Sequence, residues 1–413
     1  MHRDSEFTPQ SVSAAVAAAA GMFTSIAPII VSTFSVFLGT FIHDYGWGRG
    51  SVSFAITISA IVGGLVTPFA GRAIDRFGVR RVMLPAVALF GVTVMSLALA
   101  KGVLWQIYLG FAAVGVLGGF HNMVPYFKVA SLWFHRQRGV VLSLVSACYG
   151  LAGALMPKLV QPLVARYGWH SGYLFLGAVV LVSLLVLVPL LRVPRGSEGL
   201  RPSAADDTAP AAAVLPGVSA REARATGTFW LLFTLLFLAV MSLVGTLTQI
   251  FPMMVDRGIA PASATTVLSA FYLGSTTGQL TYGWFVDRID TPRVAVPFFA
   301  CALAGATVLY HTSNLSLLLP AAYLTGIGHG SELGLVVYFT GRYFGVRNLG
   351  AIYGLIYAGA TLASGLGPLA LGLSYDWAGS YGPMMIGFQG ALLLAICGLF
   401  MLKPYVFAAR TRP

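Results

Sequence analysis

The segment Gly71-Arg72-Ala73-Ile74-Asp75-Arg76-Phe77-Gly78-Val79-Arg80-Arg81 is a short charged stretch between two long apolar stretches. Only 9% of the 413 residues are charged, so a cluster of arginines around one aspartate is conspicuous. A second copy, Gly283-Trp284-Phe285-Val286-Asp287-Arg288, follows about 212 residues later and keeps the spacing of Gly, Asp and Arg. The repeat predicts a chain of two similar halves, each with a charged loop at the same point.

The composition excludes water as the main solvent of this chain. Hydrophobic residues make up 57% of it and the mean hydropathy is +0.82, whereas a soluble protein carries about 25% charged residues. A membrane-spanning helix needs ~20 mostly apolar residues, and residues 174–191 and 388–402 come close to unbroken examples. Long apolar runs, rather than short alternating segments, favour helices over a barrel. We therefore expect an all-α integral membrane protein.

Apolar runs divide the chain into twelve expected spans and five regions. The regions are an N-terminus (1–14), a first six-helix bundle (15–191), a linker (192–225), a second six-helix bundle (226–402) and a C-terminus (403–413). The linker is rich in Pro, Ala, Ser and charge, which is typical of a flexible connection. The expected spans cover 15–42, 51–74, 79–100, 103–133, 138–166, 169–191, 226–255, 262–286, 292–312, 315–342, 348–375 and 382–402.

Lysine and arginine residues are distributed unevenly between the two sides that these spans define. With an even number of spans both termini share one side, and most of the 25 Lys and Arg residues fall there. The opposite side carries Arg49, Lys101, Arg166 and Arg257. Because positively charged loops remain in the cytoplasm, we expect cytoplasmic termini in a bacterial inner membrane. The same bias explains the net charge of +12 without a nucleic-acid partner.

The three cysteines, Cys148, Cys301 and Cys397, lie in apolar runs and lack metal-ligand spacing. We therefore expect no disulfide, metal or cofactor. No phosphate-binding Gly-x4-Gly-Lys-Ser/Thr loop is present in the sequence, so nucleotide hydrolysis is not the expected source of energy. The remaining candidate energy sources are an ion gradient and a gradient of the substrate itself.

The two halves also share an aromatic pair. Trp133-Phe134 ends span four, and Tyr343-Phe344 ends span ten about 210 residues later. Each pair is followed by a Gly near the start of the next span, at Gly139 and Gly350. The pairs support the two-fold repeat that the charged segments indicate.

Together these segments make the chain resemble the major facilitator superfamily over essentially its whole length. The charged segments resemble that superfamily's signature after spans two and eight. Within it the chain is similar to the monocarboxylate and oxalate/formate transporters, on the strength of Tyr45-Gly46-Trp47-Gly48-Arg49, Trp133-Phe134 with Arg138-Gly139, Gly328-x-Gly330-x-Glu332 and Tyr343-Phe344-Gly345. The resemblance implies two pseudo-symmetric six-helix bundles that give rocker-switch alternating access around a midplane cavity.

The resemblance also implies gating roles for the charged segments. Gly71 would allow close helix contact, Asp75 would bind a neighbouring helix terminus, and Arg76 and Arg80 would form salt bridges between loops. The competing interpretation is that the arginines only fix the orientation of the loop. In the second copy the corresponding gating residues are Asp287 and Arg288.

Span eight departs from the pattern of the resembling group. That group often places an Arg after a Gly there to pair with the substrate carboxylate, whereas this chain has Gly278-Gln279. An amide can form hydrogen bonds but cannot neutralise charge. This departure argues against a small-carboxylate substrate held by a fixed positive charge.

Ionisable residues inside spans are the best candidates for proton coupling, because each costs at least ~2.5–3.5 kcal/mol at the centre of a membrane helix. His329 and Glu332 lie one turn apart in span ten, and we interpret them as the proton-coupling pair. A structural carboxylate and a histidine packed beside Gly328 and Gly330 are the alternatives. Lys128 in span four either attracts anions or snorkels to the surface.

The expected substrate-binding residues lie on four spans and carry hydrogen-bonding groups. For the histidine and the tyrosines of the set, the competing interpretation is that they only pack in the interior of the protein. The set comprises His121, Asn122 and Tyr126 of span four, Gln249 of span seven, Gln279 of span eight and Tyr357 of span eleven.

We therefore expect a monomeric secondary transporter, not an enzyme, whose partners are the bilayer, protons and a small molecule. The predicted substrate is an organic anion of the monocarboxylate type. A carrier of a bulkier or neutral solute, such as an aromatic acid, a peptide fragment or a drug, is the first alternative. A membrane sensor that binds ligand without transport is the second.

Overall fold

The computed structural model describes residues 7–134, 137–193, 217–286, 288–345 and 347–407, and helices dominate it. The first half contains α1 (Pro9–Phe23), α2 (Ser32–Tyr45), α3 (Arg49–Phe77), α4 (Val79–Ser96), α5 (Leu104–Phe120), α6 (Met123–Trp133), α7 (Arg138–Tyr167) and α8 (Trp169–Leu190). The second contains α9 (Ala220–Arg224), α10 (Gly227–Asp256), α11 (Pro261–Val286), α12 (Val296–His311), α13 (Leu315–Phe344), α14 (Leu349–Ala378) and α15 (Gly382–Met401). Short turns precede α2 at Ala27–Val31, follow α4 at Leu97–Leu99 and precede α12 at Pro292–Ala295.

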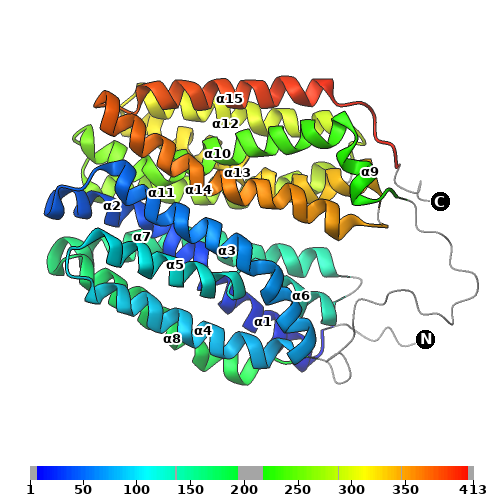
Figure 1. Cartoon of the computed structure of the whole chain (residues 1–413), viewed down its shortest axis with the longest axis horizontal. Coiled ribbons are helices and arrows are strands. Elements are labelled where there is room, and N and C mark those ends of the chain that lie inside the picture. Colours follow the sequence, from blue (N-terminus) through cyan, green and yellow to red (C-terminus); the bar gives the residue numbers. More distant parts are fainter. Residues whose placement is uncertain (1–6, 135–136, 194–216, 287, 346, 408–413) are drawn as a thin grey trace, which may run out of the picture. The chain divides into compact units, whose positions relative to one another are not determined.

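The helices are long enough and apolar enough for a membrane protein. Within the described residues, 10 helices or joined helix pairs meet the length and hydropathy of a membrane span. The other two long helices, α11 and α13, contain many Gly, Ser and Thr residues, which lower their hydropathy. The all-α membrane fold predicted from the sequence is therefore confirmed (Figure 1).

The chain divides into two compact units. Unit 1 contains residues 1–203 and 260–269, and unit 2 contains residues 204–259 and 270–413. The first turns of α11 thus cluster with unit 1, although the rest of the helix belongs to unit 2.

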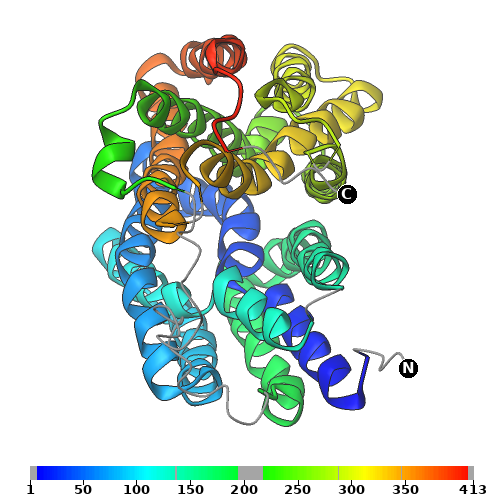
Figure 2. The same ribbon diagram turned by 90° about the vertical axis from the view of Figure 1, so that its right-hand side faces the viewer.

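Corresponding helices pack together inside each unit. In unit 1, α1 packs on α7, α3 on α5, and α4 on α8. In unit 2 the equivalent pairs are α10 with α14, α11 with α13, and α12 with α15. Figure 2 shows the helices of each unit nearly end-on. The repeated pairing is the structural counterpart of the repeated sequence.

The charged segment that begins at Gly71 is helical rather than a loop. Helix α3 continues to Phe77 and α4 begins at Val79, so Gly78 alone makes the turn. Its φ of 88° lies in the region that only glycine enters without strain. The sequence-based expectation of a loop is therefore wrong, because one glycine suffices to reverse the chain.

The end of the expected linker is part of unit 2. The Val218 N–H donates to the Phe344 carbonyl oxygen at 2.9 Å, and Ala223 of α9 is fully buried. Ser219 and Glu222 form a capping box that starts α9, and the Ser219 N–H lowers the pKa of the Glu222 carboxyl. Residues 217–225 are therefore ordered, contrary to the expectation for 192–225, whereas 194–216 lie outside the described residues.

Two expected single spans are each interrupted in the middle. The first runs from Pro9 to Tyr45 but breaks between α1 and the turn at Ala27–Val31. The fourth breaks between α5 and α6 at His121 and Asn122. Hydropathy alone cannot reveal these interruptions, because both halves of each span are apolar.

Candidate functional site

The most unusual ionisable residues in unit 2 are Glu332 and His329 on α13. They are 3% and 5% exposed, and His329 Nδ1 lies 2.8 Å from Glu332 Oε1. The distance suits an ion pair, but the orientation does not meet hydrogen-bond geometry, so Nδ1 has no hydrogen bond within the described part of the chain. Glu332 Oε2 is also buried without a hydrogen-bond partner among the described residues. A buried unpartnered carboxylate oxygen is costly while it is charged.

Glycines hold α13 directly against α11. A Cβ atom on Gly326 would lie 1.9 Å from the Phe271 carbonyl oxygen, and one on Gly330 would lie 1.8 Å from the Ser275 carbonyl oxygen. Only glycine permits backbones to approach so closely. The expectation of tight packing at Gly330 is met here, and it places His329 5.4 Å from the Phe271 ring, measured between centroids.

Tyrosines of α14 lie near this pair. The rings of Tyr353 and Tyr357 are stacked with centroids 5.5 Å apart. Tyr357 lies within electrostatic range of Glu332. Of the predicted set, the structure therefore brings Glu332 and His329 together and places Tyr357 within electrostatic range of Glu332. Gln279 of α11 is half-buried, and its backbone N lies beside Gly330.

Gln249 occupies a separate position on α10. Its side chain is 1% exposed, and its Oε1 accepts a hydrogen bond from the Tyr381 hydroxyl at 3.4 Å. Tyr381, the residue before α15, did not stand out in the sequence, because tyrosines are common at membrane interfaces. Its contact was detectable only from the fold.

His121 joins the two interrupted spans of unit 1. Its Nε2 lies 2.8 Å from the Thr24 carbonyl oxygen, and its Nδ1 lies 2.6 Å from the Tyr126 hydroxyl. The Ile26 N–H donates to the His121 carbonyl oxygen at 3.1 Å. Because a carbonyl only accepts, Nε2 carries the hydrogen and Nδ1 accepts from Tyr126. His121 is 0% exposed, so this geometry fits a structural histidine, one of the two interpretations of the sequence.

Tyr126 and Asn122 also have structural contacts. The Tyr126 ring fills the space beside Gly21, where a Cβ would lie 2.0 Å from the ring. The Asn122 Oδ1 accepts the Val124 N–H at 2.9 Å and starts α6, and its Nδ2 donates to the Gly119 carbonyl oxygen at 2.8 Å. The predicted span-four residues therefore form the joint between α5 and α6.

The predicted gating residues contact groups in their own unit. Asp75 forms an ion pair with Lys128 of α6 rather than binding a helix terminus. Arg80 donates to the Val188 carbonyl oxygen near the end of α8 at 2.7 Å rather than forming a salt bridge. A free carbonyl at a helix end is a natural partner for a cation.

The remaining predicted gating residues either contact a neighbouring aromatic ring in their own helix or sequence segment, or make no close contact that needs a glycine. A Cβ on Gly71 would meet nothing within 4 Å, so the expected close helix contact is absent here. The guanidinium carbon of Arg76 lies 5.2 Å from the centroid of the Phe77 ring, and that of Arg288 lies 3.9 Å from that of Trp284. Asp287 lies outside the described residues.

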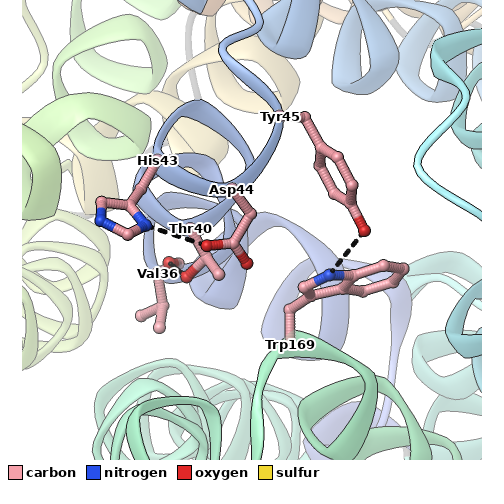
Figure 3. Close-up of polar contacts among 6 residues, drawn as sticks. All are labelled: Val36, Thr40, His43, Asp44, Tyr45 and Trp169. Carbon is pink, nitrogen blue, oxygen red and sulfur yellow. Dashed lines mark hydrogen bonds and ion pairs between the residues drawn. The ribbon is translucent and has the colours of Figure 1, made fainter.

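The opposite end of unit 1 is held by aromatic residues. Figure 3 shows the Trp169 Nε1–H, at the start of α8, donating to the Tyr45 hydroxyl at 3.2 Å. Beside it, His43 and Asp44 form an exposed pair 2.9 Å apart. Tyr45 also stacks on Trp47, with centroids 4.8 Å apart. The Tyr45–Arg49 segment quoted from the sequence is thus a packing element.

Comparisons with known proteins agree with this architecture. The family model of the Major Facilitator Superfamily matches residues 12–258 and 245–412. The chain is 26% identical to the 3-(3-hydroxy-phenyl)propionate transporter of Escherichia coli over 79% of each chain. It is 24% identical to the gallate transporter of Pseudomonas putida, with 78% of this chain and 80% of the relative covered. Monocarboxylate transporter 4 of Rattus norvegicus is 27% identical over 41% of this chain and 36% of the relative.

A solved structure shares the fold at lower sequence identity. It is a bacterial homologue of the human lysosomal transporter Spinster, captured inward-facing and unoccupied. The match has a TM-score of 0.68 and 15% identity, and covers 96% of each chain. Together with the two units of similarly paired helices in the described residues, the matches show that the chain belongs to the major facilitator superfamily of membrane transporters.

Proposed function

We propose that this protein is a secondary transporter that carries an organic acid together with a proton. The observation that carries the proposal is the buried Glu332 carboxylate, with one oxygen unpartnered and His329 2.8 Å from the other. Bringing an organic anion near a buried carboxylate costs repulsion unless a proton accompanies it. Binding of the anion and loading of the proton would therefore be coupled.

We propose further that the substrate is an aromatic acid rather than a small monocarboxylate. Two relatives that match most of the chain are named for 3-(3-hydroxy-phenyl)propionate and gallate. The stacked Tyr353 and Tyr357 offer aromatic faces near Glu332, and aromatic rings pair favourably with one another. Gln279 stands where the resembling transporters often have an Arg, and the absence of that fixed positive charge also favours the larger acid. Gln249, Gln279 and Tyr357 are the proposed substrate contacts.

Transport would follow the alternating access expected of the superfamily. We place both termini in the cytoplasm of a bacterial cell, because the loops on that side hold most of the Lys and Arg residues. The Asp75 and Arg288 segments would then lie at the cytoplasmic ends of their spans, where they are proposed to take part in gating.

Proteoliposome uptake tests the proposal. The probes are radiolabelled 3-(3-hydroxyphenyl)propionate, gallate and acetate, together with the uncharged amide of the first. An inward proton gradient should drive accumulation of an aromatic acid above the level in protein-free liposomes, and acetate and the amide should not exceed that level. Equal accumulation with and without the gradient would exclude proton coupling, and accumulation of the amide would favour the neutral-solute alternative.

The variant Glu332→Gln separates coupling from binding. We expect it to lose gradient-driven accumulation, by at least about tenfold, and to retain exchange of internal for external substrate, which needs no net proton movement. The matched control is Glu222→Gln, which changes an exposed carboxylate of α9 outside the spans. Wild-type accumulation by Glu332→Gln would remove Glu332 from the mechanism.

A further inference from the structure

The repeated aromatic pairs have no part in the proposed coupling, yet each forms an equivalent contact. In unit 1, the Trp133 Nε1–H, at the end of α6, donates to the carbonyl oxygen of Arg192 at 2.9 Å. In unit 2, the Tyr343 hydroxyl, near the end of α13, donates to the carbonyl oxygen of Lys403 at 2.6 Å. Arg192 is the second residue after α8, and Lys403 is the second residue after α15.

The two bonds use different donors but join equivalent points. An indole N–H serves in unit 1 and a phenol O–H in unit 2, so the repeated feature is the bond and not the residue type. Carbonyl groups just beyond a helix have no partner inside that helix. Each aromatic donor therefore satisfies a carbonyl and fixes the exit of one helix to the end of another.

Charged residues add further links at the same end of unit 1. Lys128 of α6 pairs with Asp75 of α3, and Arg80 of α4 donates to the Val188 carbonyl oxygen of α8 at 2.7 Å. With the Trp133 bond, these contacts join α3, α6, α8 and α4 in one connected chain. We call this the tied end of unit 1.

Unit 2 has a corresponding tied end. Arg342 of α13 lies 2.8 Å from Asp290, just after α11, and its carbonyl oxygen accepts the Phe407 N–H at 3.0 Å. The guanidinium carbon of Arg293 lies 5.8 Å from the centroid of the Phe400 ring of α15, within cation–π range. The Tyr343 bond again closes the connection between α13 and α15.

We infer that Trp133 and Tyr343 are positioning residues for transport: they make α6 move with α8, and α13 move with α15, as the transporter changes state. A helix whose end is hydrogen-bonded to the exit of another helix cannot bend there independently, so the bonded ends of each unit move together. The inference needs only the transport activity of the superfamily, and does not depend on the identity of the substrate or on the coupling ion.

Distance measurements between spin labels test this within unit 2. Labels are placed at Arg347→Cys, in the turn after α13, and Met401→Cys, at the end of α15; both positions are exposed. The native cysteines are replaced by serine. In liposomes, where the protein samples its states without substrate, the protein with Tyr343 intact should give one narrow distance. Tyr343→Phe, which deletes one oxygen atom, should add a second, longer distance.

The control is Tyr282→Phe, because the Tyr282 side chain is also buried and its hydroxyl has no hydrogen-bond partner in the part of the chain that the structure describes. It should keep the single distance. A merely structural bond would lower the thermal midpoint of Tyr343→Phe without adding a distance, and that result would overturn the inference. A second distance in Tyr282→Phe would overturn it too, because the change would then not depend on the Tyr343 bond.

The equivalent experiment in unit 1 uses Trp133→Phe. Labels at Ser131, in the last turn of α6, and at Arg192, just after α8, report the ends of these two helices, since a side-chain change at Arg192 leaves its carbonyl in place. Trp105→Phe, an exposed indole at the start of α5, is the control. If the hydrogen bond links the helices in both units, the distribution of label distances should broaden in Trp133→Phe and stay unchanged in the control. One narrow distance in both variants would refute the inference for this unit.

Discussion

At the scale of single residues, His121 shows how a buried polar side chain acquires a structural role. Its imidazole contacts the Thr24 carbonyl and the Tyr126 hydroxyl, and its backbone carbonyl accepts the Ile26 N–H, so each contact satisfies a polar atom in the interior of unit 1. Leaving a buried donor or acceptor unsatisfied costs about 1–3 kcal/mol. The joint between the two interrupted spans therefore depends on an imidazole at this position.

We predict that His121→Ala lowers the thermal unfolding midpoint of the purified transporter, because the Thr24 carbonyl and the Tyr126 hydroxyl both lose their partner. The expected loss of stability is about 2–6 kcal/mol, from two unsatisfied groups at about 1–3 kcal/mol each. His43→Ala is the control, since the His43 side chain is 89% exposed. Identical midpoints for the two variants would contradict the structural role of His121.

The sequence indicated some of these residue contacts and could not indicate others. Glu332 and His329 were expected to meet because residues three apart lie on one helical face. The Thr24 carbonyl that accepts from His121 lies 97 positions away, just after α1, so no local pattern identifies it. Likewise the charged segment around Asp75 is visible in the sequence, but the pairing of Asp75 with Lys128 depends on how α3 and α6 lie together.

At the scale of elements, the contact between α11 and α13 sets the position of the candidate site. The backbones approach until a Cβ would overlap a carbonyl oxygen, as at Gly330. The sequence predicted close packing from the glycines themselves. It did not indicate which helix would be the partner, because that depends on the fold of unit 2.

We predict that Gly330→Ala destabilises the transporter and shifts Glu332, because α11 and α13 must separate to admit a methyl group. Overpacking of this kind costs about 1–3 kcal/mol. Gly350→Ala is a matched control, because a Cβ there would meet nothing within 4 Å. Unfolding midpoints and gradient-driven uptake should fall in the first variant and not in the second; equal behaviour would argue against the close contact.

At the scale of the whole molecule, the repeat in the sequence foretold two bundles, and the structure contains them. The excess of Lys and Arg on one side predicts that both termini are cytoplasmic.

In a cysteine-free background, Lys101→Cys should react with a membrane-impermeant maleimide on intact spheroplasts, and Lys403→Cys should react only after lysis. Both side chains are exposed, so burial would not explain a difference. The opposite labelling pattern would reverse the proposed topology.

Because Val218 and α9 pack onto unit 2, they determine where the chain can be divided into two separately expressed fragments. A break between residues 194 and 216 would leave the Val218–Phe344 hydrogen bond and the buried Ala223 within the second fragment. A break after Arg224 would leave both Val218 and Ala223 on the first fragment, and the second fragment would begin with an uncovered apolar surface. Fragment complementation should therefore tolerate the first site and fail at the second.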